Sequence, residues 1–594
     1  MKLPEISQTN DRVTMLNAFM GLNKNPKITD SEFADMKNIT NDYFPTIGTR
    51  KKRGIAKNFT KIQGVLGGAA FSYVDNSKFY YDESYVCDLE ESNVERQLVS
   101  MGAYIVVFPD GLIYNTETDQ SEYIVNEVTT SAPPTMTLCR IDGTPYDAVS
   151  GNTPPGDLTK AWIDTSSDPV VLKMYSSNTS SWVSVGTTYV KFAATDIGVG
   201  FSDYDAATFS GVDVNDPDIY NNWDFNQSNI IYKADDDYLI VAGLINSTHT
   251  NTTAITVKRE MPEMDYVVEL NNRIYGCSSE NHEIYACKLG DPKNWYCYAG
   301  LDSDSYAATV GTQEDFTGAA AYRGYVFFFK DSGYHQLYGT KPSNFQITWN
   351  PGRGVQIGSS KSICVVNNYL MFKSREGVCL FDGSTQVVSE NLGAEPYYDG
   401  VAGAYRDKYF ISMRDDDYYY RVYVYDTSKG TWCIEDDRRF IFSATTSGAL
   451  YLIGEDNIAY MVNNENMYVK RFPSNDTYPS DDTYPGAVLN GTLEDTLEWM
   501  LETGDIGVDS PFQKYLKRID LRLLLTESSM LRIEVEYDST DDWFTLYEYF
   551  CTKKRSYSVP INVQRCDHLR LRFSGFGEFR LFSIAKVIEE GSDV

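Results

Sequence analysis

Residues 325–339 have the sequence YVFFFKDSGYHQLYG, in which two runs of aromatic and apolar residues flank a turn of Asp, Ser and Gly. Such a stretch predicts a β-hairpin, because Asp, Ser and Gly are typical of the turn between two strands. Four further stretches in the second half of the chain share this design. They are RIYGCSSENHEIYAC (residues 273–287), YLMFKSREGVCLFDG (369–383), YFISMRDDDYYYRVYVYD (409–426) and LYLIGEDNIAYMV (450–462).

These hairpins recur at a nearly regular spacing. Measured from Ile274 through Val326, Leu370, Phe410 and Leu450, the steps are 52, 44, 40 and 40 residues. A period of this size, with one supersecondary unit per step, is typical of a β-propeller. Two earlier stretches, AAFSYVDNSKFYY (residues 69–81) and AYIVVFPDGLIYN (103–115), have the same design. We therefore expect about six or seven blades, beginning near residue 60.

The composition agrees with a mainly β protein of several domains. A chain of 594 residues is too long for one ordinary core, and its 14% aromatic content suits pleated sheets. The ten cysteines lack CxxC or metal-ligand spacing, which predicts buried free thiols made in a reducing cytoplasm rather than disulfides. The chain starts without an apolar signal segment and has no apolar run of bilayer length. We therefore expect neither Sec export nor membrane insertion.

Interruptions of the repeat predict the domain organisation. Residues 125–264 are rich in Thr, Ser, Asp and Pro, and the C-terminal strands alternate apolar with charged residues, as in a half-buried sheet. We expect an extended N-terminal arm over residues 1–58, with a short helical turn starting at residues 29–31. The other expected parts are propeller over 59–124, an inserted small β domain over 125–264, propeller again over 265–472, a linker over 473–490 and an antiparallel β-sandwich over 491–594.

No catalytic motif is present in the sequence. The four histidines lie outside any HExxH pattern, and there is no GxSxG, Walker A or GxGxxG sequence between a strand and a helix. We therefore expect no enzyme and no cofactor. The alternative for residues 213–218, DVNDPD, is a Ca²⁺ site, although the EF-hand glycine and distal Glu are missing. Tyr418 to Tyr420 and the run starting at Trp295 are candidate carbohydrate platforms, but packing between blades is the favoured interpretation.

Charge is distributed unevenly. The net charge is −31, and residues 203–237 contain nine Asp and one Lys, whereas residues 511–580 contain twelve Lys or Arg and ten Asp or Glu. A surface this acidic repels nucleic acid and anionic membranes, although solubility alone is an alternative explanation. The C-terminal part is electrostatically distinct and is a candidate docking surface for an acidic neighbour.

Both ends of the chain contain characteristic short sequences. At the N-terminus they are Gly21-Leu22-Asn23, Ile28, Glu32-Phe33, Met36, Asn38, Pro45 and Arg50 to Arg53. At the C-terminus they are Trp499, GDI, KYLKRIDLR, YDSTDDW, VPINVQRCDHLRLRFSG and EEGSDV. Both sets resemble tail-associated virion proteins of bacteriophages that infect gut Firmicutes. Within the insert, AWIDTSSDPVVLKMYSSNTSSWVSV resembles short β modules of phage tail proteins. Together these segments cover about a third of the chain.

This resemblance implies a structural virion component, similar to the propeller-bearing tail hub or nozzle proteins of short-tailed phages, also called packaged-DNA stabilisation proteins. Such proteins form a ring, typically of six copies, that continues the DNA channel below the portal and adaptor. The chain would then assemble in the host bacterial cytoplasm, enter the virion tail and contact double-stranded DNA transiently.

An acidic channel wall suits this role, because cationic walls would hold each phosphate. The expected channel lining is Asp213, Asp216, Asp218, Asp235, Asp236 and Asp237. The expected docking residues are Lys514, Lys517, Arg518 and Arg522. The alternatives are a receptor-binding or glycan-degrading tail spike or fibre, and a bacterial sensor or carbohydrate-binding propeller.

Overall fold

The fold is nearly all β in the computed structural model. The structure describes residues 11–213, 219–221, 223–446, 448–462, 468–469, 488–489, 492–508, 513–526, 529–550, 555–561 and 564–590. Within them, the helical elements are three short 3-10 turns, η1 (Pro342–Asn344), η2 (Ser360–Ser362) and η3 (Glu390–Leu392). Two compact units are formed, one by Met1–Glu95, Phe329–Tyr334 and Pro351–Val594, the other by Arg96–Phe328 and His335–Asn350.

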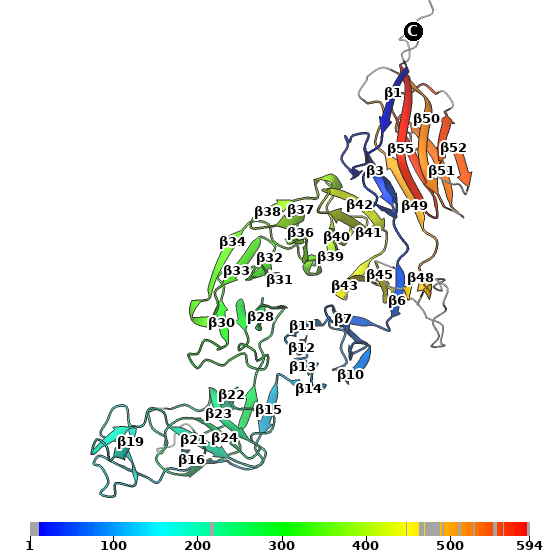
Figure 1. Cartoon of the computed structure of the whole chain (residues 1–594). Helices are drawn as coiled ribbons and strands as arrows, with labels where there is room; N and C mark the ends of the chain where they lie inside the picture. Colours follow the sequence, from blue (N-terminus) through cyan, green and yellow to red (C-terminus); the bar gives the residue numbers. More distant parts are fainter. Residues whose placement is uncertain are drawn as a thin grey trace, which may run out of the picture. The chain divides into compact units, whose positions relative to one another are not determined.

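The repeated hairpins belong to the blades of a β-propeller (Figure 1). Six blades are four-stranded sheets whose strands pair in sequence order. Two blades precede the insert: β7 (Ile62–Leu66), β8 (Ser72–Asp75), β9 (Lys78–Tyr81) and β10 (Ser84–Asp88) form one, and β11 (Gln97–Met101), β12 (Tyr104–Phe108), β13 (Leu112–Asn115) and β14 (Gln120–Tyr123) form the next. After the insert, one blade contains β27 (Tyr266–Glu269), β28 (Ile274–Ser278), β29 (Glu283–Ala286) and β30 (Tyr306–Thr309), and another contains β31 (Phe316–Tyr322), β32 (Tyr325–Lys330), β33 (Gly333–Tyr338) and β34 (Gln346–Pro351). The last two of the six contain β35 (Cys364–Val366), β36 (Tyr369–Ser374), β37 (Gly377–Phe381) and β38 (Thr385–Val387), and β39 (Tyr398–Tyr405), β40 (Lys408–Arg414), β41 (Tyr420–Asp426) and β42 (Thr431–Asp436). The predicted propeller is thus confirmed.

The seventh blade joins distant parts of the sequence. Its strands pair in the order β43 (Phe440–Thr446), β44 (Ala449–Gly454), β45 (Ile458–Met461), β6 (Gly54–Asn58) and β48 (Thr492–Leu493). The register places Ile458 opposite Asn58 and Met461 opposite Gly54. An N-terminal strand therefore completes the last blade, and the propeller begins at β6, within the segment that we expected to be an arm.

The insert also has the predicted β structure. Its larger sheet has the order β15 (Asn126–Thr129), β26 (Thr256–Arg259), β22 (Ala206–Ser210), β23 (Ser228–Asp235), β24 (Tyr238–Ala242), β21 (Tyr189–Ala193), β16 (Thr135–Cys139) and β25 (His249–Thr250). A smaller sheet contains β17 (Ala148–Gly151), β18 (Ala161–Asp164), β19 (Val171–Ser176) and β20 (Ser181–Ser184). Phe192, Phe209 and Phe225 meet edge-to-face in their common core.

The C-terminal domain is the predicted antiparallel sandwich, but strands from the N-terminus complete both sheets. One sheet has the order β4 (Ile39–Thr40), β5 (Ile47–Thr49), β55 (Phe579–Glu590), β50 (Lys514–Leu525) and β53 (Arg555–Pro560), with β1 (Asp11–Leu16) also paired to β55. The other has the order β2 (Gly21–Leu22), β3 (Glu32–Lys37), β49 (Glu498–Thr503), β54 (Leu569–Phe576), β51 (Met530–Tyr537) and β52 (Phe544–Phe550). A separate pair is β46 (Tyr468–Val469) with β47 (Val488–Leu489).

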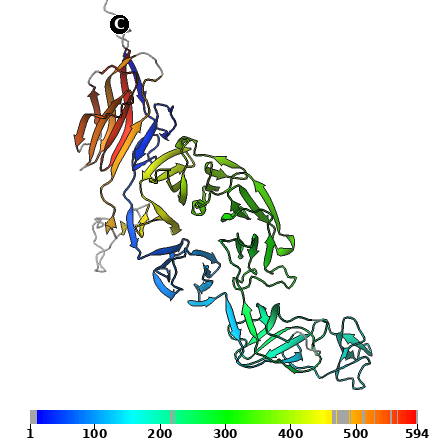
Figure 2. The same cartoon turned by 180° about the vertical axis from the view of Figure 1, so that it is seen from behind.

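The N-terminal segment is extended, but the expected helical turn near Thr29 is wrong. The Glu32 carboxylate accepts hydrogen bonds from the Thr29 N–H at 2.8 Å and from its hydroxyl at 2.9 Å, which is the local pattern of a helix cap. The chain nevertheless continues into β3, where Met36 lies opposite Leu501. Pairing with β49 therefore overrides the local signal. In both views the blue N-terminal strands lie among the orange and red C-terminal ones (Figure 1, Figure 2).

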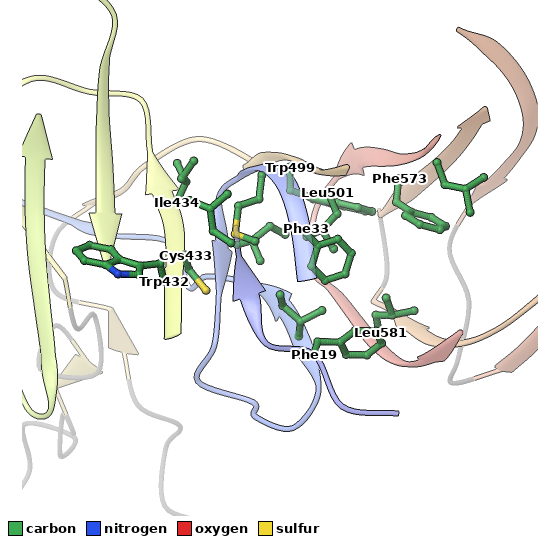
Figure 3. Close-up of a cluster of buried hydrophobic side chains, with 14 of the residues drawn as sticks. Phe19, Phe33, Trp432, Cys433, Ile434, Trp499, Leu501, Phe573 and Leu581 are labelled. Carbon is green, nitrogen blue, oxygen red and sulfur yellow. The ribbon is translucent and has the colours of Figure 1, made fainter. Parts of the chain in front are cut away.

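One hydrophobic core joins the sandwich to a propeller blade. Trp432 and Ile434 of β42, Phe33 of β3 and Trp499 of β49 are all buried in it. Figure 3 shows Phe33 and Trp499 on one side of β42 and the Trp432 ring pointing away from them. The Trp499 ring stacks on Phe579, with ring centroids 4.1 Å apart. Burying side chains of this size stabilises by roughly 2–3 kcal/mol each. Continuous packing therefore holds the N-terminal strands, the sandwich and this blade together.

Candidate assembly surfaces

The acidic triplet Asp235 to Asp237 forms the exposed turn between β23 and β24. Neighbouring main chain fixes this turn, because Gly198 N–H donates to the Asp236 carbonyl at 3.0 Å. A Cβ at Gly198 would lie 2.0 Å from the Asp235 carbonyl oxygen, so this close approach requires glycine. The triplet is thus an ordered hairpin turn.

Two further aspartates extend this acidic surface. The backbone N–H of exposed Asp196 donates to the Asp237 carboxylate at 3.2 Å, and the exposed Asp203 carboxylate accepts from the Ala234 N–H at 2.8 Å. We call these five residues the acidic patch: Asp196, Asp203, Asp235, Asp236 and Asp237. Five exposed carboxylates on a fixed backbone produce a negative local potential, which repels phosphate groups.

Of the other three expected channel residues, only Asp213 is among the described residues. Asp213 fixes a neighbouring loop, because its carboxylate accepts hydrogen bonds from the Thr252 N–H and hydroxyl, each at 2.8 Å. Burial tends to raise the pKa of Asp213, but the hydrogen bonds from Thr252 and His249 outweigh it, and the pKa is lowered. Asp216 and Asp218 lie outside the described residues. Among the residues that are described, no group of three or more His, Cys, Asp or Glu side chains is arranged to hold a metal ion.

The four expected docking residues on β50 differ in exposure. Lys514 is buried, with 3% of its surface exposed, and donates to the Gly507 carbonyl at 2.6 Å, so it is not a surface residue. The physical reason is a β-bulge between Leu516 and Arg518. Strict alternation would place Lys514 on the same face as Arg518, but the bulge reverses the pattern and turns Lys514 inward.

The remaining three docking residues lie nearer the surface. Lys517 forms an ion pair with Glu589 at 2.7 Å, and exposed Arg518 forms one with Asp520 at 3.1 Å. The exposed Arg522 donates to the Ser556 hydroxyl at 3.5 Å. Two arginines, one of them paired with Asp520, are thus presented on the outer face of this sheet.

A buried junction that the sequence did not predict fixes the insert to the blade β11–β14. Arg259, at the end of β26, donates from Nε to the Ile124 carbonyl at 2.8 Å and from Nη1 to Asp205 at 2.5 Å. Its Nη2 donates to the Tyr123 carbonyl at 3.2 Å. Asn294 donates to the other Asp205 oxygen at 2.9 Å. We call Arg259, Asp205 and Asn294 the insert junction.

A second unpredicted cluster ties the N-terminal segment to the last blades. Arg50 and Arg53 form ion pairs with Asp436, and Arg50 also pairs with Glu494. Each of these four side chains is at most 4% exposed. We call Arg50, Arg53, Asp436 and Glu494 the terminal junction. In the sequence, Arg50 to Arg53 form a basic run typical of a surface patch, but the first and last members are structural.

The pKa values of the two arginines in the terminal junction shift in opposite directions. Burial is the largest influence on both, and it lowers the pKa of Arg53 despite the neighbouring Asp436. For Arg50, the hydrogen bond and charge of Glu494 outweigh burial and raise the pKa. The Nε and Nη2 atoms of Arg53 have no hydrogen-bond partner among the described residues. The terminal junction thus buries charged side chains whose hydrogen bonds are only partly satisfied within the described residues.

Comparison with known proteins gives no family. No family model matches this chain, and no curated protein is similar to it. Among solved structures, Raptor from Chaetomium thermophilum is 10% identical (TM-score 0.30), with 70% of this chain and 29% of Raptor covered. This chain therefore spans less than a third of Raptor's length. The WD40 repeats of RRP9 are 8% identical (TM-score 0.27; 69% and 96% covered), and BamB from Moraxella catarrhalis is 11% identical (TM-score 0.30; 70% and 97% covered).

Glycoside hydrolases also occur among the matched structures. They include the exo-beta-1,3-galactanase of Phanerochaete chrysosporium, at 10% identity and TM-scores of 0.21 or below. At scores this low, none of these matches assigns an activity or a partner to this chain. Within the described residues, no helix is both long and apolar enough to cross a membrane.

Proposed function

We propose that this chain is a structural component of a bacteriophage virion tail. In this proposal, copies form a ring that continues the DNA channel below the portal and adaptor, retains the packaged genome and then conducts it. The role needs no catalytic residue, so we propose no enzymatic activity and no cofactor. The chain would assemble in the host bacterial cytoplasm and contact double-stranded DNA only transiently.

The acidic patch is the observation that carries the proposal. Its five carboxylates are exposed, while the domain that presents them is fixed through the buried Arg259–Asp205 pair. A rigid acidic surface repels phosphates, so it can guide a duplex without binding it. Arg518 and Arg522 on the sandwich offer the opposite charge for docking to an acidic neighbour. The resemblance of both chain ends to phage tail proteins agrees with this assignment.

The oligomeric state of the purified full chain tests the proposal. Mass photometry and negative-stain electron microscopy should show a closed ring, most simply of six copies. A trimer would instead favour the alternative, a receptor-binding or glycan-degrading spike or fibre. A stable monomer at micromolar concentration would contradict the ring. Release of sugar from host capsule or wall glycans would contradict the non-enzymatic role.

A further inference from the structure

The turn between β40 and β41 presents two tyrosines to solvent. Tyr418 is 74% exposed and Tyr419 is 68% exposed, so the expected packing of these rings between blades is wrong. By contrast, Trp295 is buried, with 1% exposure, as expected for a ring in the core. Exposure of large aromatic rings to water is unfavourable in free energy, so a group of them on the surface indicates a binding site for a ligand or another protein.

The turn holds these rings in fixed positions. The Asp415 carboxylate accepts from the Asp417 N–H at 3.0 Å and from the Tyr419 N–H at 2.9 Å. Tyr418 has φ of 65°, a left-handed conformation that is unfavourable for a bulky side chain. The Arg414 guanidinium lies 4.6 Å from the centroid of the Tyr418 ring and holds it from one side. Strain of this kind persists where the surroundings enforce it, and it concentrates at binding sites.

The tyrosines line one wall of a cleft of about 440 Å³, within the range of about 300–1,000 Å³ that is typical of small-ligand sites. The buried side chains of Met36 and Ile434 also contribute to its lining. Three ion pairs surround this apolar part: Asp35 with Arg421 at 2.7 Å, Lys37 with Asp437 at 2.8 Å and Arg439 with Glu455 at 3.2 Å.

The chemistry of this cleft selects a class of ligand. The lining contains four carboxylates and three cations. Three of the carboxylates are paired with the three cations, and the fourth, Asp436, is buried and paired with Arg50 and Arg53, so the cleft offers little net attraction for an anion or a cation. The carboxylates accept hydrogen bonds and the guanidinium and ammonium groups donate them, so hydroxyl groups can be paired in both directions. Flat aromatic faces suit the C–H face of a pyranose ring. A neutral sugar combines these features, since it carries hydroxyls around an apolar face.

We propose that the cleft beside Tyr418 and Tyr419 binds a neutral oligosaccharide. The rigid turn reduces the ordering cost of binding, because the rings are already in place. Tyr419 contributes the platform for one sugar ring, and Arg421 and Glu455 pair with its hydroxyls. This site is additional to the proposed ring and does not depend on it, because all of its residues lie on one chain.

Isothermal titration calorimetry of the full chain with chitohexaose, maltohexaose and cellohexaose tests the site. At least one of these neutral probes should bind with a Kd of about 1 mM or tighter. Tyr419→Ala should weaken that binding at least tenfold, whereas Tyr85→Ala, which removes a 53% exposed tyrosine elsewhere, should leave it unchanged. Tyr418→Gly should weaken binding while the Tm stays unchanged or rises, because glycine tolerates the left-handed conformation.

Three results would overturn the proposal. They are the absence of binding for all three probes, equal binding by the Tyr419→Ala variant, and equal loss of binding in the Tyr85→Ala control. Mass photometry on the same samples reports ring formation separately. A failed glycan experiment with intact rings would therefore refute the cleft alone.

Discussion

The insert junction and the terminal junction both use buried arginines to fasten added segments to the propeller, but they pair those arginines differently. Arg259 donates to one carboxylate and to the carbonyls of Ile124, Tyr123 and Gly200, so each of its nitrogens has a partner. In the terminal junction, two arginines share Asp436. Two nitrogens of Arg53 lack a partner among the described residues.

This difference has a physical consequence. Neutral carbonyls satisfy hydrogen bonds without adding charge, so the loss of Asp205 would leave Arg259 still solvated by main chain. The terminal junction instead depends on charge balance, because burial of two cations is tolerated only while the carboxylates are ionised beside them. We therefore expect the terminal junction to be the more sensitive of the two to single substitutions.

The largest effect is expected from Asp436→Ala. It leaves Arg50 and Arg53 buried with Glu494 as the nearest balancing charge, which should lower the free energy of unfolding by about 3–5 kcal/mol. Denaturant unfolding monitored by tryptophan fluorescence measures this loss. Asp437→Ala is the matched control, because the 55% exposed side chain of Asp437 forms a surface pair with Lys37. Its effect should stay below about 1 kcal/mol.

The terminal junction also predicts that the protein loses stability at low pH. Burial tends to raise the pKa of Asp436, but Arg53 and Arg50 outweigh it and lower that pKa below its ordinary value of 3.8. A carboxylate whose pKa is lower in the folded than in the unfolded state stabilises the fold at any pH above its unfolded-state pKa. This stabilisation is lost as the pH falls through the pKa of the folded state. The difference between wild type and Asp436→Ala should therefore be constant near neutral pH and shrink below about pH 4. A constant difference down to pH 2 would contradict this origin.

A smaller effect is expected from Asp205→Ala at the insert junction. Arg259 would keep its three carbonyl acceptors, so we expect a loss of about 2–3 kcal/mol, confined to the insert. Hydrogen exchange should show faster opening of β22 and β26, with β39–β42 unaffected. Asp203→Ala, which removes an exposed carboxylate of the acidic patch, is the control. A loss larger than that of Asp436→Ala would reverse the comparison.

The hairpins of the blades could be predicted from the sequence, because the two strands of each hairpin are neighbours in the chain. Val326, Leu370 and Leu450 sit at matching positions of β32, β36 and β44, and all are buried, as the period predicts. The two junctions were not predictable, because Arg53 and Asp436 lie 383 positions apart and nothing local marks them as partners. Lys514 was placed wrongly because alternation cannot reveal a bulge. The exposed tyrosines were misjudged because a run of aromatic residues looks the same in a strand and in a turn.

A still smaller effect, of the opposite sign, is expected from Lys373→Met. Lys373 is buried with 1% exposure and donates to the Gln356 side chain at 2.9 Å. Among the described residues, no acidic side chain is paired with it, in contrast to Arg53. Burial lowers the pKa of Lys373 from 10.5 to about 8. At pH 7 Lys373 is still mostly charged, but burial makes this charge less favourable in the folded state than in the unfolded chain. The substitution should therefore stabilise by about 1 kcal/mol after loss of the hydrogen bonds.

The pH dependence distinguishes this explanation from better packing. The unfolded chain binds more protons than the folded one between about pH 8 and 10.5, so wild-type stability rises across this interval. The advantage of Lys373→Met should thus be complete below pH 8 and decrease as the pH rises toward 10. An advantage independent of pH would mean that methionine packing is responsible. Lys408 offers a contrast, because Glu435 and Asp42 outweigh burial and raise its pKa.

The smallest change in stability is expected where charge is fully exposed. The combined substitution Asp235→Asn, Asp236→Asn and Asp237→Asn should change the free energy of unfolding by less than about 0.5 kcal/mol, because the turn depends on main-chain hydrogen bonds to Asp236 and Asp237. Its effect should instead be electrostatic. Fluorescence anisotropy with a short DNA duplex should show no binding by wild type, and none or little by the Asn variant.

Charge reversal at the same three positions gives the stronger test. Asp235→Lys, Asp236→Lys and Asp237→Lys should create duplex binding that weakens steeply with salt, since each neutralised phosphate releases counterions. Reversal of Asp416, Asp417 and Glu91, three exposed acidic residues elsewhere, controls for overall charge. If the acidic patch lines the channel, rings with reversed Asp235–Asp237 should retain DNA while rings with this control reversal release it. Equal retention by both variants would mean that net charge, and not the position of the acidic patch, keeps the duplex free.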